Sequence, residues 1–183
     1  MKLRPSSYLV LGMLRLGAKS GYAIKKATDL STRVFFPTSL AQVYPELARL
    51  ESAGLVVRRD DPRGGRSRSA YDLTPEGQEA LLAWLRSERF APTQFRDEGL
   101  TRLFFADALP HEEQIELVRR LRDRARNAQR WMQTEVLPSA QAVQHSGFRH
   151  PHAVARIGAD TYGFFADRLE ELASELDRET NDR

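Results

Sequence analysis

Cysteine is missing from this chain of 183 residues. Its absence excludes disulfide bonds, thiol catalysis and zinc sites with cysteine ligands. Long apolar runs are missing as well, because no stretch approaches the roughly 18 uninterrupted apolar residues that a transmembrane helix needs. The apolar segment 9–13 is too short for a secretion signal, and no small-residue cleavage site follows it. We therefore expect a soluble cytoplasmic protein that makes no contact with a membrane.

The motifs of the common enzyme classes are absent too. No glycine-rich phosphate loop follows a strand pattern, and no nucleophile elbow or ordered pair of carboxylates occurs. His145, His150 and His152 stand close together, but they lack the i, i+4 spacing of a metal-binding helix with a carboxylate in reach. We interpret them as part of a surface loop. We expect no enzymatic activity, no cofactor and no metal site.

Charge is distributed unevenly along the chain. Residues 1–90 hold 15 Lys or Arg against 9 Asp or Glu, whereas residues 91–183 hold 13 against 16. The segment Ala91-Pro92-Thr93 marks a boundary between two domains, 1–90 and 93–183. A basic first half joined to a mildly acidic second half is typical of a nucleic-acid-binding domain with a separate body.

The first domain has the pattern of a winged helix. Apolar residues at helical spacing predict helices over 6–16, 21–31 and 38–51. In the third of these helices the apolar side chains form one inward stripe, which leaves the opposite face for a partner. Pro45 lies inside this helix and removes one backbone hydrogen bond, so we expect a bend there and not an end.

A basic hairpin follows the third helix. Strand patterns over 55–59 and 69–73 are joined by the Gly64-Gly65 turn, and Thr74-Pro75 begins a further helix. A helix, a stop and a basic hairpin in this order allow a small domain to place one helix in the DNA major groove and a flexible tip beside the backbone. The first domain is therefore predicted to bind double-stranded DNA.

The wing and the third helix supply the first candidates for DNA contact. Arginines at the turn can follow a phosphate path or enter a minor groove. The alternative is a solvated loop that does not contact DNA. These arginines are Arg63, Arg66 and Arg68. On the third helix the candidates for the groove are Thr38, Ser39 and Gln42. The amide of Gln42 has the donor and acceptor that pair with adenine.

A second set of candidates has an equally ordinary interpretation. Tyr22 and Tyr44 either bond phosphates through their hydroxyl groups or pack as half-buried core tyrosines. Lys25 and Lys26 are either phosphate ligands or a charged helix face. The arginines between 119 and 130 are spread around their helix, so we interpret them as a solvated face with pairs at three or four residues.

The second domain is helical throughout in pattern. Amphipathic segments over 96–108, 110–136 and 152–178 predict three helices, with a loop over 146–151. The long helices carry more apolar residues than one chain can cover, which indicates a homodimer. We expect its interface to contain Ile115, Val118, Leu121, Leu169, Leu172 and Leu176. The predicted fold class is mainly α: a winged helix-turn-helix with a two-stranded wing, then an all-α dimerisation domain.

Aromatic residues of the second domain are candidates for two roles. They are Trp131, Tyr162, Phe164 and Phe165. A core shared by two copies is the favoured interpretation. A pocket for a small, aromatic effector is the alternative, because a dimer interface is also where a pocket would form.

Several segments also match a known pattern. In the first domain these are Leu9-Val10-Leu11-Gly12-Met13-Leu14, Ser20-Gly21-Tyr22-Ala23-Ile24, the tyrosine-proline helix with its Glu-x-x-Gly-Leu end over 39–56, and residues 68–77. Together they resemble the PadR family of bacterial transcription factors. Residues 96–178, with Asp97-Glu98-Gly99-Leu100, are similar to the helical C-terminal domain of many members.

The resemblance implies a fold and a function. It implies a winged helix, a helical domain that dimerises by exchanging helices, and operator binding that usually represses transcription until a small molecule relieves it. A protein–protein adaptor, in which the winged helix binds a protein partner, is the alternative. The arginines of the wing favour DNA, because an adaptor has no need of them at an exposed tip.

Overall fold

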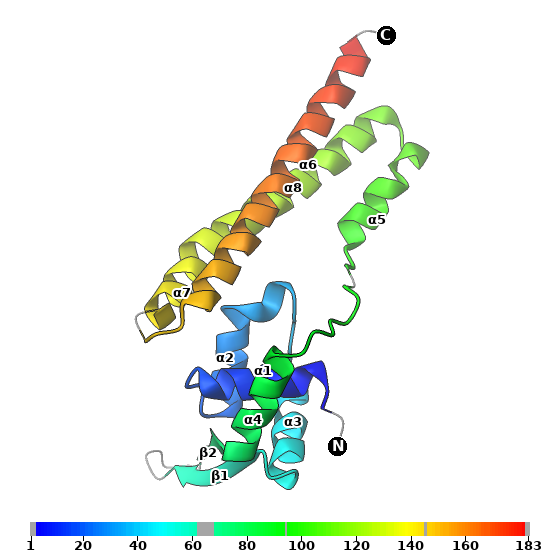
Figure 1. Cartoon of the computed structure of the whole chain (residues 1–183). Helices are drawn as coiled ribbons and strands as arrows, with labels where there is room; N and C mark the ends of the chain where they lie inside the picture. The colour runs from blue at the N-terminus through cyan, green and yellow to red at the C-terminus, as the bar shows by residue number, and fades with distance from the viewer. Residues whose placement is uncertain (1–2, 62–67, 94, 145, 182–183) are drawn as a thin grey trace. The chain divides into compact units, whose positions relative to one another are not determined.

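The computed structural model describes residues 3–61, 68–93, 95–144 and 146–181. It contains two compact units, Met1–Ala91 and Pro92–Arg183 (Figure 1). Helices dominate the described residues, and a two-stranded antiparallel hairpin follows the first helices. The sequence-based assignment to the mainly α class with a two-stranded wing is confirmed.

The first unit contains four α-helices and one hairpin in its described part. They are α1 (Pro5–Arg15), α2 (Gly21–Asp29), α3 (Leu40–Ser52), β1 (Val56–Asp61), β2 (Arg68–Leu73) and α4 (Pro75–Leu85), with a 3-10 turn η1 (Thr32–Val34) after α2. Ser20 caps α2 by accepting a hydrogen bond from the Ala23 amide at 3.1 Å. Thr74 caps α4 in the same way, as the sequence predicts.

The core of the first unit forms where α1, α2 and α3 meet. Val43, Leu47 and Leu50 of α3 are fully buried and belong to one cluster with Leu11 of α1 and Ile24 of α2. Full burial of a side chain of this size contributes about 1.5–3 kcal/mol. The inward stripe of α3 is thus confirmed, and it fixes which face of this helix remains outside.

The start of α3 differs from the prediction. Its first residue is Leu40 and its N-cap is Ser39, so Thr38 lies before the helix and not within it. The reason is the capping geometry, because the N-cap residue has an extended backbone and cannot be part of the first turn. The helix continues through Pro45 to Ser52, so the prediction that the proline does not end it is confirmed.

A tight turn connects α3 to the hairpin. Gly54 has a φ of 70°, a left-handed backbone that favours glycine, and the Leu55 amide donates to the Leu50 carbonyl at 2.9 Å. The strands then pair antiparallel, from Val56 opposite Leu73 onwards. The hairpin extends from one edge of the first unit (Figure 1).

The second unit contains only helices in its described part. They are α5 (Glu98–Phe104), a 3-10 turn η2 (Ala106–Ala108), α6 (His111–Trp131), a π-helical turn η3 (Met132–Val136), α7 (Leu137–Gln144) and α8 (Arg149–Asn181). Asp97 caps α5 by accepting a hydrogen bond from the Leu100 amide at 3.0 Å.

Two helix boundaries of the second unit correct the sequence-based expectation. The helix that begins at His111 does not end near Val136, since the π turn leads directly into α7. A π turn inserts one residue into a helix and keeps the chain helical. The last helix begins at Arg149 and not at residue 152, so His150 lies on α8 and not in the predicted loop, and His152 lies on α8 as well. His145 lies outside the described residues.

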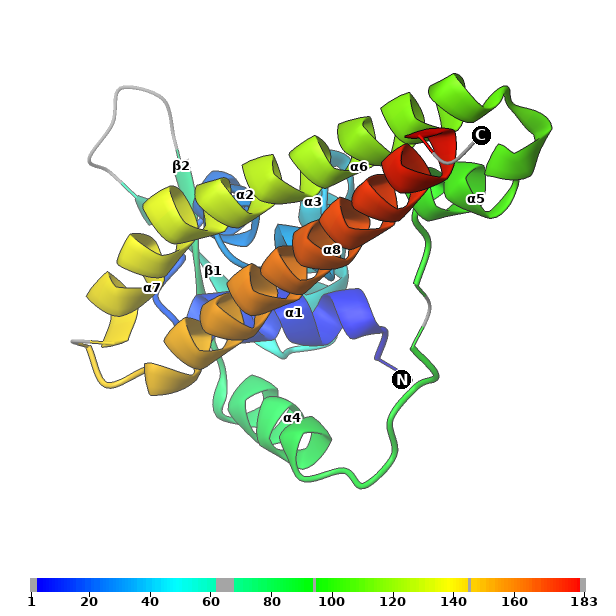
Figure 2. The same ribbon diagram turned by 90° about the horizontal axis from the view of Figure 1, so that it is seen from above.

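Helices α6 and α8 lie side by side along much of their length (Figures 1 and 2). Five of the six residues expected at a dimer interface belong to the apolar cluster that this packing forms within one chain, and the sixth, Ile115, is buried as well. Four are buried and two are half-buried: Ile115, Val118, Leu121 and Leu169, then Leu172 and Leu176. Helices α6 and α8 of one chain therefore cover these six side chains, whereas Val154, Ile157 and Phe164 of the same apolar pattern stay exposed.

Ion pairs also join α6 to α8. The arginines of α6 were expected to pair within their own helix, but several reach across to α8: Arg119 to Asp177 at 2.6 Å, Arg122 to Glu170 at 3.1 Å and Arg126 to Asp167 at 2.7 Å. Exposed pairs of this kind contribute about 0–1 kcal/mol each. They set the alignment of the two helices more than their stability.

Among the described residues, no helix combines the length and apolar character that crossing a bilayer requires. Within the same residues, no group of three or more His, Cys, Asp and Glu side chains is placed to hold a metal ion.

Candidate nucleic-acid interface

The outward face of α3 is the centre of the candidate interface. Val43 and Leu47 face the core, whereas the other side of the helix is exposed and carries Leu40, Ala41, Gln42, Tyr44, Pro45 and Ala48. A helix held by a buried stripe and open on its opposite side has the geometry that a winged helix needs to enter a major groove.

Gln42 has a structural task in addition to its candidate role. Its Oε1 accepts a hydrogen bond from the Ser39 amide at 2.9 Å, and the two residues form a reciprocal capping box. Bidentate pairing with adenine uses both ends of the amide. Such a contact therefore requires the cap to open, and Nε2 is the end of the amide outside the capping box.

Thr38 and Ser39 form the entry to α3. The Thr38 hydroxyl donates to the Phe36 carbonyl at 3.4 Å, and Ser39 is committed to the N-cap. Both contacts stabilise the start of the helix. The structure thus places these two candidates at the N-terminal end of α3 and not on its exposed face.

Two tyrosines differ in how far they are exposed. The side chain of Tyr22 on α2 is 68% exposed, and that of Tyr44 on α3 is 50% exposed. The ring of Tyr44 lies against the backbone of Gly21, where a Cβ would stand 2.6 Å from its Cε1 atom. Neither tyrosine is part of the core cluster of the first unit, so the core interpretation fits neither, and both remain candidates for phosphate contact.

The two lysines of α2 are not equivalent. Lys25 forms an ion pair with Asp29 one turn further along the helix. Lys26 is exposed. A phosphate contact by Lys25 would compete with its carboxylate partner, so Lys26 is the better placed of the two.

The wing tip carries the strongest sequence candidates. Arg63 and Arg66 lie outside the described residues. Arg68 begins β2, where its backbone stands opposite Asp61. The contact between wing arginines and DNA therefore stays a prediction.

A polar network that the sequence did not reveal ties the hairpin to the turn before α2. Lys19 Nζ lies 2.5 Å from one carboxylate oxygen of Asp72, and Arg59 Nε lies 3.2 Å from the other. The Tyr71 amide also donates to the Lys19 carbonyl at 2.7 Å. The hydrogen bond from Lys19, with the nearby Arg59 charge, holds the pKa of the Asp72 carboxyl below its usual value.

A second network that sequence reasoning missed joins α3 to α1. Glu46 is a buried carboxylate on α3, and Arg49 Nη2 donates to its Oε1 at 2.5 Å and to the buried Ser7 hydroxyl at 2.6 Å. Burial alone would raise the pKa of the Glu46 carboxyl, but the hydrogen bonds from Ser7 and Arg49 outweigh it, so this pKa lies below its usual value. The network holds the exposed face of α3 at one orientation on α1.

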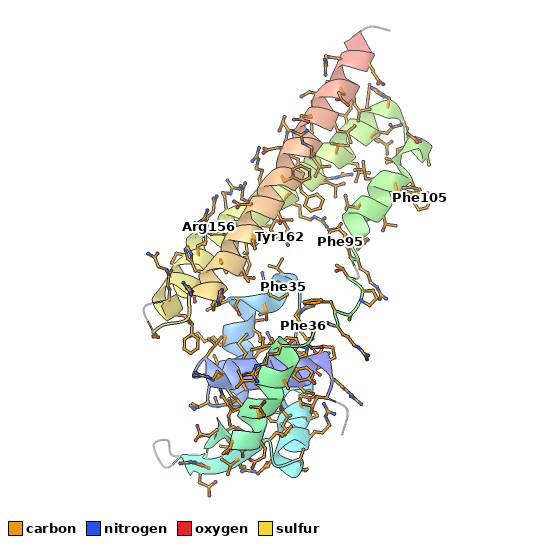
Figure 3. The ribbon with its side chains drawn as sticks, viewed as in Figure 1. Phe35, Phe36, Phe95, Phe105, Arg156 and Tyr162 are labelled. Carbon is orange, nitrogen blue, oxygen red and sulfur yellow. The ribbon has the colours of Figure 1, made fainter. Side chains whose placement is uncertain are left out.

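The four aromatic candidates of the second unit are divided between two places. Trp131 and Tyr162 are half-buried against the cluster beside η3, and Tyr162 projects from α8 (Figure 3). Phe164 is exposed, and Phe165 stacks on Phe95 with ring centroids 6.0 Å apart. They do not line one enclosed cavity. An open depression in this unit is lined instead by Phe95, Arg96, Asp97, Glu98, Leu100, Thr101 and Phe104.

Residues 10–83, from α1 to α4, match the model described as the transcriptional regulator PadR-like family. Over 116 residues the chain is 30% identical to the negative transcriptional regulator PadR of Bacillus subtilis (strain 168). Over its first unit the chain is thus similar to the PadR-like family. The match covers 63% of the chain and 64% of the length of that relative. This similarity agrees with the sequence-based expectation of a transcriptional regulator.

Solved structures of the PadR-like family share the fold over almost the whole chain. The crystal structure of Bacillus subtilis PadR in complex with operator DNA has a TM-score of 0.83 at 23% identity, covering 96% of this chain and 99% of that one. A PadR-like transcriptional regulator from Bacillus cereus has a TM-score of 0.79 at 19% identity, covering 96% and 97%. Bacillus subtilis PadR in complex with p-coumaric acid has a TM-score of 0.70 at 22% identity, covering 95% and 99%.

Proposed function

We propose that this protein is a cytoplasmic, homodimeric transcriptional regulator that binds specific operator DNA, represses transcription and is released by a small aromatic effector. The observation that carries DNA binding is the geometry of α3, with one face buried on α1 and α2 and the other exposed. The basic balance of residues 1–90 supports the same function, because phosphate contacts dominate DNA affinity. Its relative named as a negative regulator supports repression.

The homodimer is supported by apolar side chains that the second unit leaves exposed. On α8, Ile157 and Phe164 are 65% and 61% exposed. Phe104 and Phe105 at the end of α5 are exposed as well, and Phe105 extends outward (Figure 3). Monomeric proteins rarely leave large apolar patches uncovered. A second copy that covers these side chains would hold two α3 helices for half-sites about one turn of DNA apart.

The effector is supported by a relative and by a local feature. Bacillus subtilis PadR has been crystallised with p-coumaric acid, a small aromatic acid. In this chain the half-buried Trp131 directly precedes the π turn η3, and π turns are frequent at functional sites. We keep Trp131, Tyr162, Phe164 and Phe165 as effector candidates, with p-coumaric acid as the first probe of tryptophan emission and of DNA release.

Selection of duplexes from a random pool by the purified protein tests the proposed function. We expect enrichment of sequences with two symmetric half-sites whose centres lie roughly 10 base pairs apart. Binding without enrichment would contradict a sequence-specific regulator. No binding to any duplex would favour the adaptor hypothesis, in which the winged helix binds a protein.

A further inference from the structure

The ring of Tyr44 occupies the space in which residue 21 would carry a side chain. An ideal Cβ on Gly21 would lie 2.6 Å from Cε1, 2.8 Å from Cζ and 3.0 Å from Cδ1 of this ring. Carbon atoms that are not bonded attract one another best at about 3.5–4.0 Å. The ring therefore lies directly on the backbone of α2, and a methyl group at residue 21 would displace it.

The backbone gives no other reason for glycine at this position. The described glycines with a left-handed backbone are Gly17, Gly54 and Gly147, and Gly21 is not among them. Gly21 is the first residue of α2, and the Ser20 side chain already caps this turn through the Ala23 amide. Alanine is a better helix residue than glycine. The glycine is thus explained by the contact with Tyr44 and not by the conformation of α2.

The orientation of the Tyr44 side chain depends on this contact. The residue before it, Val43, and Leu47 are buried, whereas half of the Tyr44 side chain is exposed on the outward face of α3. A half-exposed tyrosine without a supporting surface exchanges between staggered rotamers. Seating one side of the ring on Gly21 restricts this exchange and fixes the direction of the hydroxyl group.

We propose that Gly21 is a positioning residue for Tyr44: the missing side chain at residue 21 seats the tyrosine ring so that its hydroxyl donates a hydrogen bond to a DNA phosphate oxygen. This inference rests on the proposed DNA binding. Tyrosine hydroxyls are common phosphate donors, and such contacts set the register of a protein on the duplex. Gly21 itself need not touch DNA for this effect.

A double-mutant cycle tests the inference, with wild type, Gly21→Ala, Tyr44→Ala and the double variant. Thermal stability and affinity for a selected duplex are measured for each. Gly21→Ala should fold, because the clashing atoms belong to a side chain that can turn outward. It should weaken duplex binding about tenfold, the loss expected for one displaced phosphate hydrogen bond. When Gly21→Ala is added to Tyr44→Ala, we expect no further loss of duplex affinity and no loss of thermal stability, because no ring remains to be displaced.

Two further variants separate this role from a purely structural one. Gly12→Ala is the matched control, because a Cβ on Gly12 of α1 meets nothing within 4 Å, and it should leave affinity unchanged. Tyr44→Phe keeps the seated ring and removes the hydroxyl. It should therefore bind the selected duplex more weakly than wild type, with an unchanged thermal stability. Adding Gly21→Ala to Tyr44→Phe should cost stability but little further affinity.

The outcomes distinguish this inference from the proposed function. If wild type binds duplex and Gly21→Ala binds equally well, the positioning role is wrong. Equal effects of Gly21→Ala with and without the Tyr44 ring would also overturn it. If wild type binds no duplex, the proposed function fails and takes the DNA role of Tyr44 with it, while coupled stabilities would still demonstrate the seating of the ring.

Discussion

Arg49 on α3 donates a hydrogen bond to the buried hydroxyl of Ser7 on α1, with 2.6 Å between Nη2 and Oγ. The same nitrogen lies 2.5 Å from Oε1 of Glu46, which is itself buried. If one partner of a buried charge pair moves away, the other is left as an uncompensated buried charge, which costs free energy. Such a pair therefore favours one geometry. This pair therefore fixes the orientation of α3, whose other face is the candidate for DNA contact.

Removing Glu46 should destabilise the first unit. In Glu46→Ala, Arg49 keeps a largely buried charge without its carboxylate, and we expect a loss of about 2 kcal/mol in the free energy of unfolding. Urea unfolding of the variant measures this loss. Glu51→Ala, an exposed carboxylate on the same helix, is the control. A change below about 0.5 kcal/mol, the range of ordinary surface substitutions, would show that the network does not hold α3.

The carboxylates with lowered pKa values predict an acid-sensitive fold. Asp72, Glu46 and Asp97 all have pKa values below their usual ones. A carboxyl whose pKa is depressed by folding stabilises the folded state above its unfolded pKa and loses this contribution as pH falls through the folded pKa. Thermal melting should therefore shift to lower temperature as pH falls from about 5 towards 3.

Asp72→Asn tests how much the polar network between the hairpin and the turn before α2 contributes to that pH dependence. The variant cannot form the ion pairs with Lys19 and Arg59, so its stability should change less between the two pH values than that of wild type. Asp60→Asn, an exposed strand carboxylate, should behave like wild type. If the stability of Asp72→Asn changed with pH as much as that of wild type, this polar network would not be a source of the acid sensitivity.

Dimerisation should depend on the exposed face of α8 and not on its buried stripe. The double substitution Ile157→Asp and Phe164→Asp should give a folded monomer, because both side chains are exposed within one chain. Leu169→Asp should unfold the second unit, because its side chain is buried between α6 and α8. Sedimentation and circular dichroism separate the two results. A wild type that is monomeric at micromolar concentration would refute the dimer itself.

The wing arginines should act on all duplexes alike. Replacing Arg63, Arg66 and Arg68 with alanine removes phosphate contacts, so affinity should drop for selected and random duplexes together. Alanine at Arg102, Arg119 and Arg120 removes the same charge from exposed ion pairs of the second unit and should affect binding far less. Equal losses in both triple variants would point to net charge and not to the wing.

Local signals in the sequence predicted the fold well. The caps Ser20 and Thr74 and the buried stripe of α3 follow from neighbouring residues, whose periodicity and capping chemistry are visible in the chain itself. The bond from Lys19 to Asp72 spans 53 residues, and no local pattern indicates it. The sequence-based candidates also left out hydrogen bonds already formed within the chain, such as that of the Gln42 amide in its capping box.

The buried stripes of the second unit show a different limit. Ile115 and Leu169 have the apolar spacing of an interface, but spacing alone does not say whether the covering helix belongs to the same chain or to another. The exposed side chains that suit a second copy, such as Ile157, were part of the same amphipathic pattern. Only the packing of α6 on α8 separates the two sets.

Salt titration of duplex binding by wild type tests the central claim most directly. Affinity for a selected duplex should fall steeply and linearly on logarithmic axes, on the order of a thousandfold between about 50 and 200 mM salt, as expected when several phosphates are neutralised. An affinity that does not change with salt, or no measurable binding at the lowest salt, would contradict the account of this protein as a DNA-binding regulator.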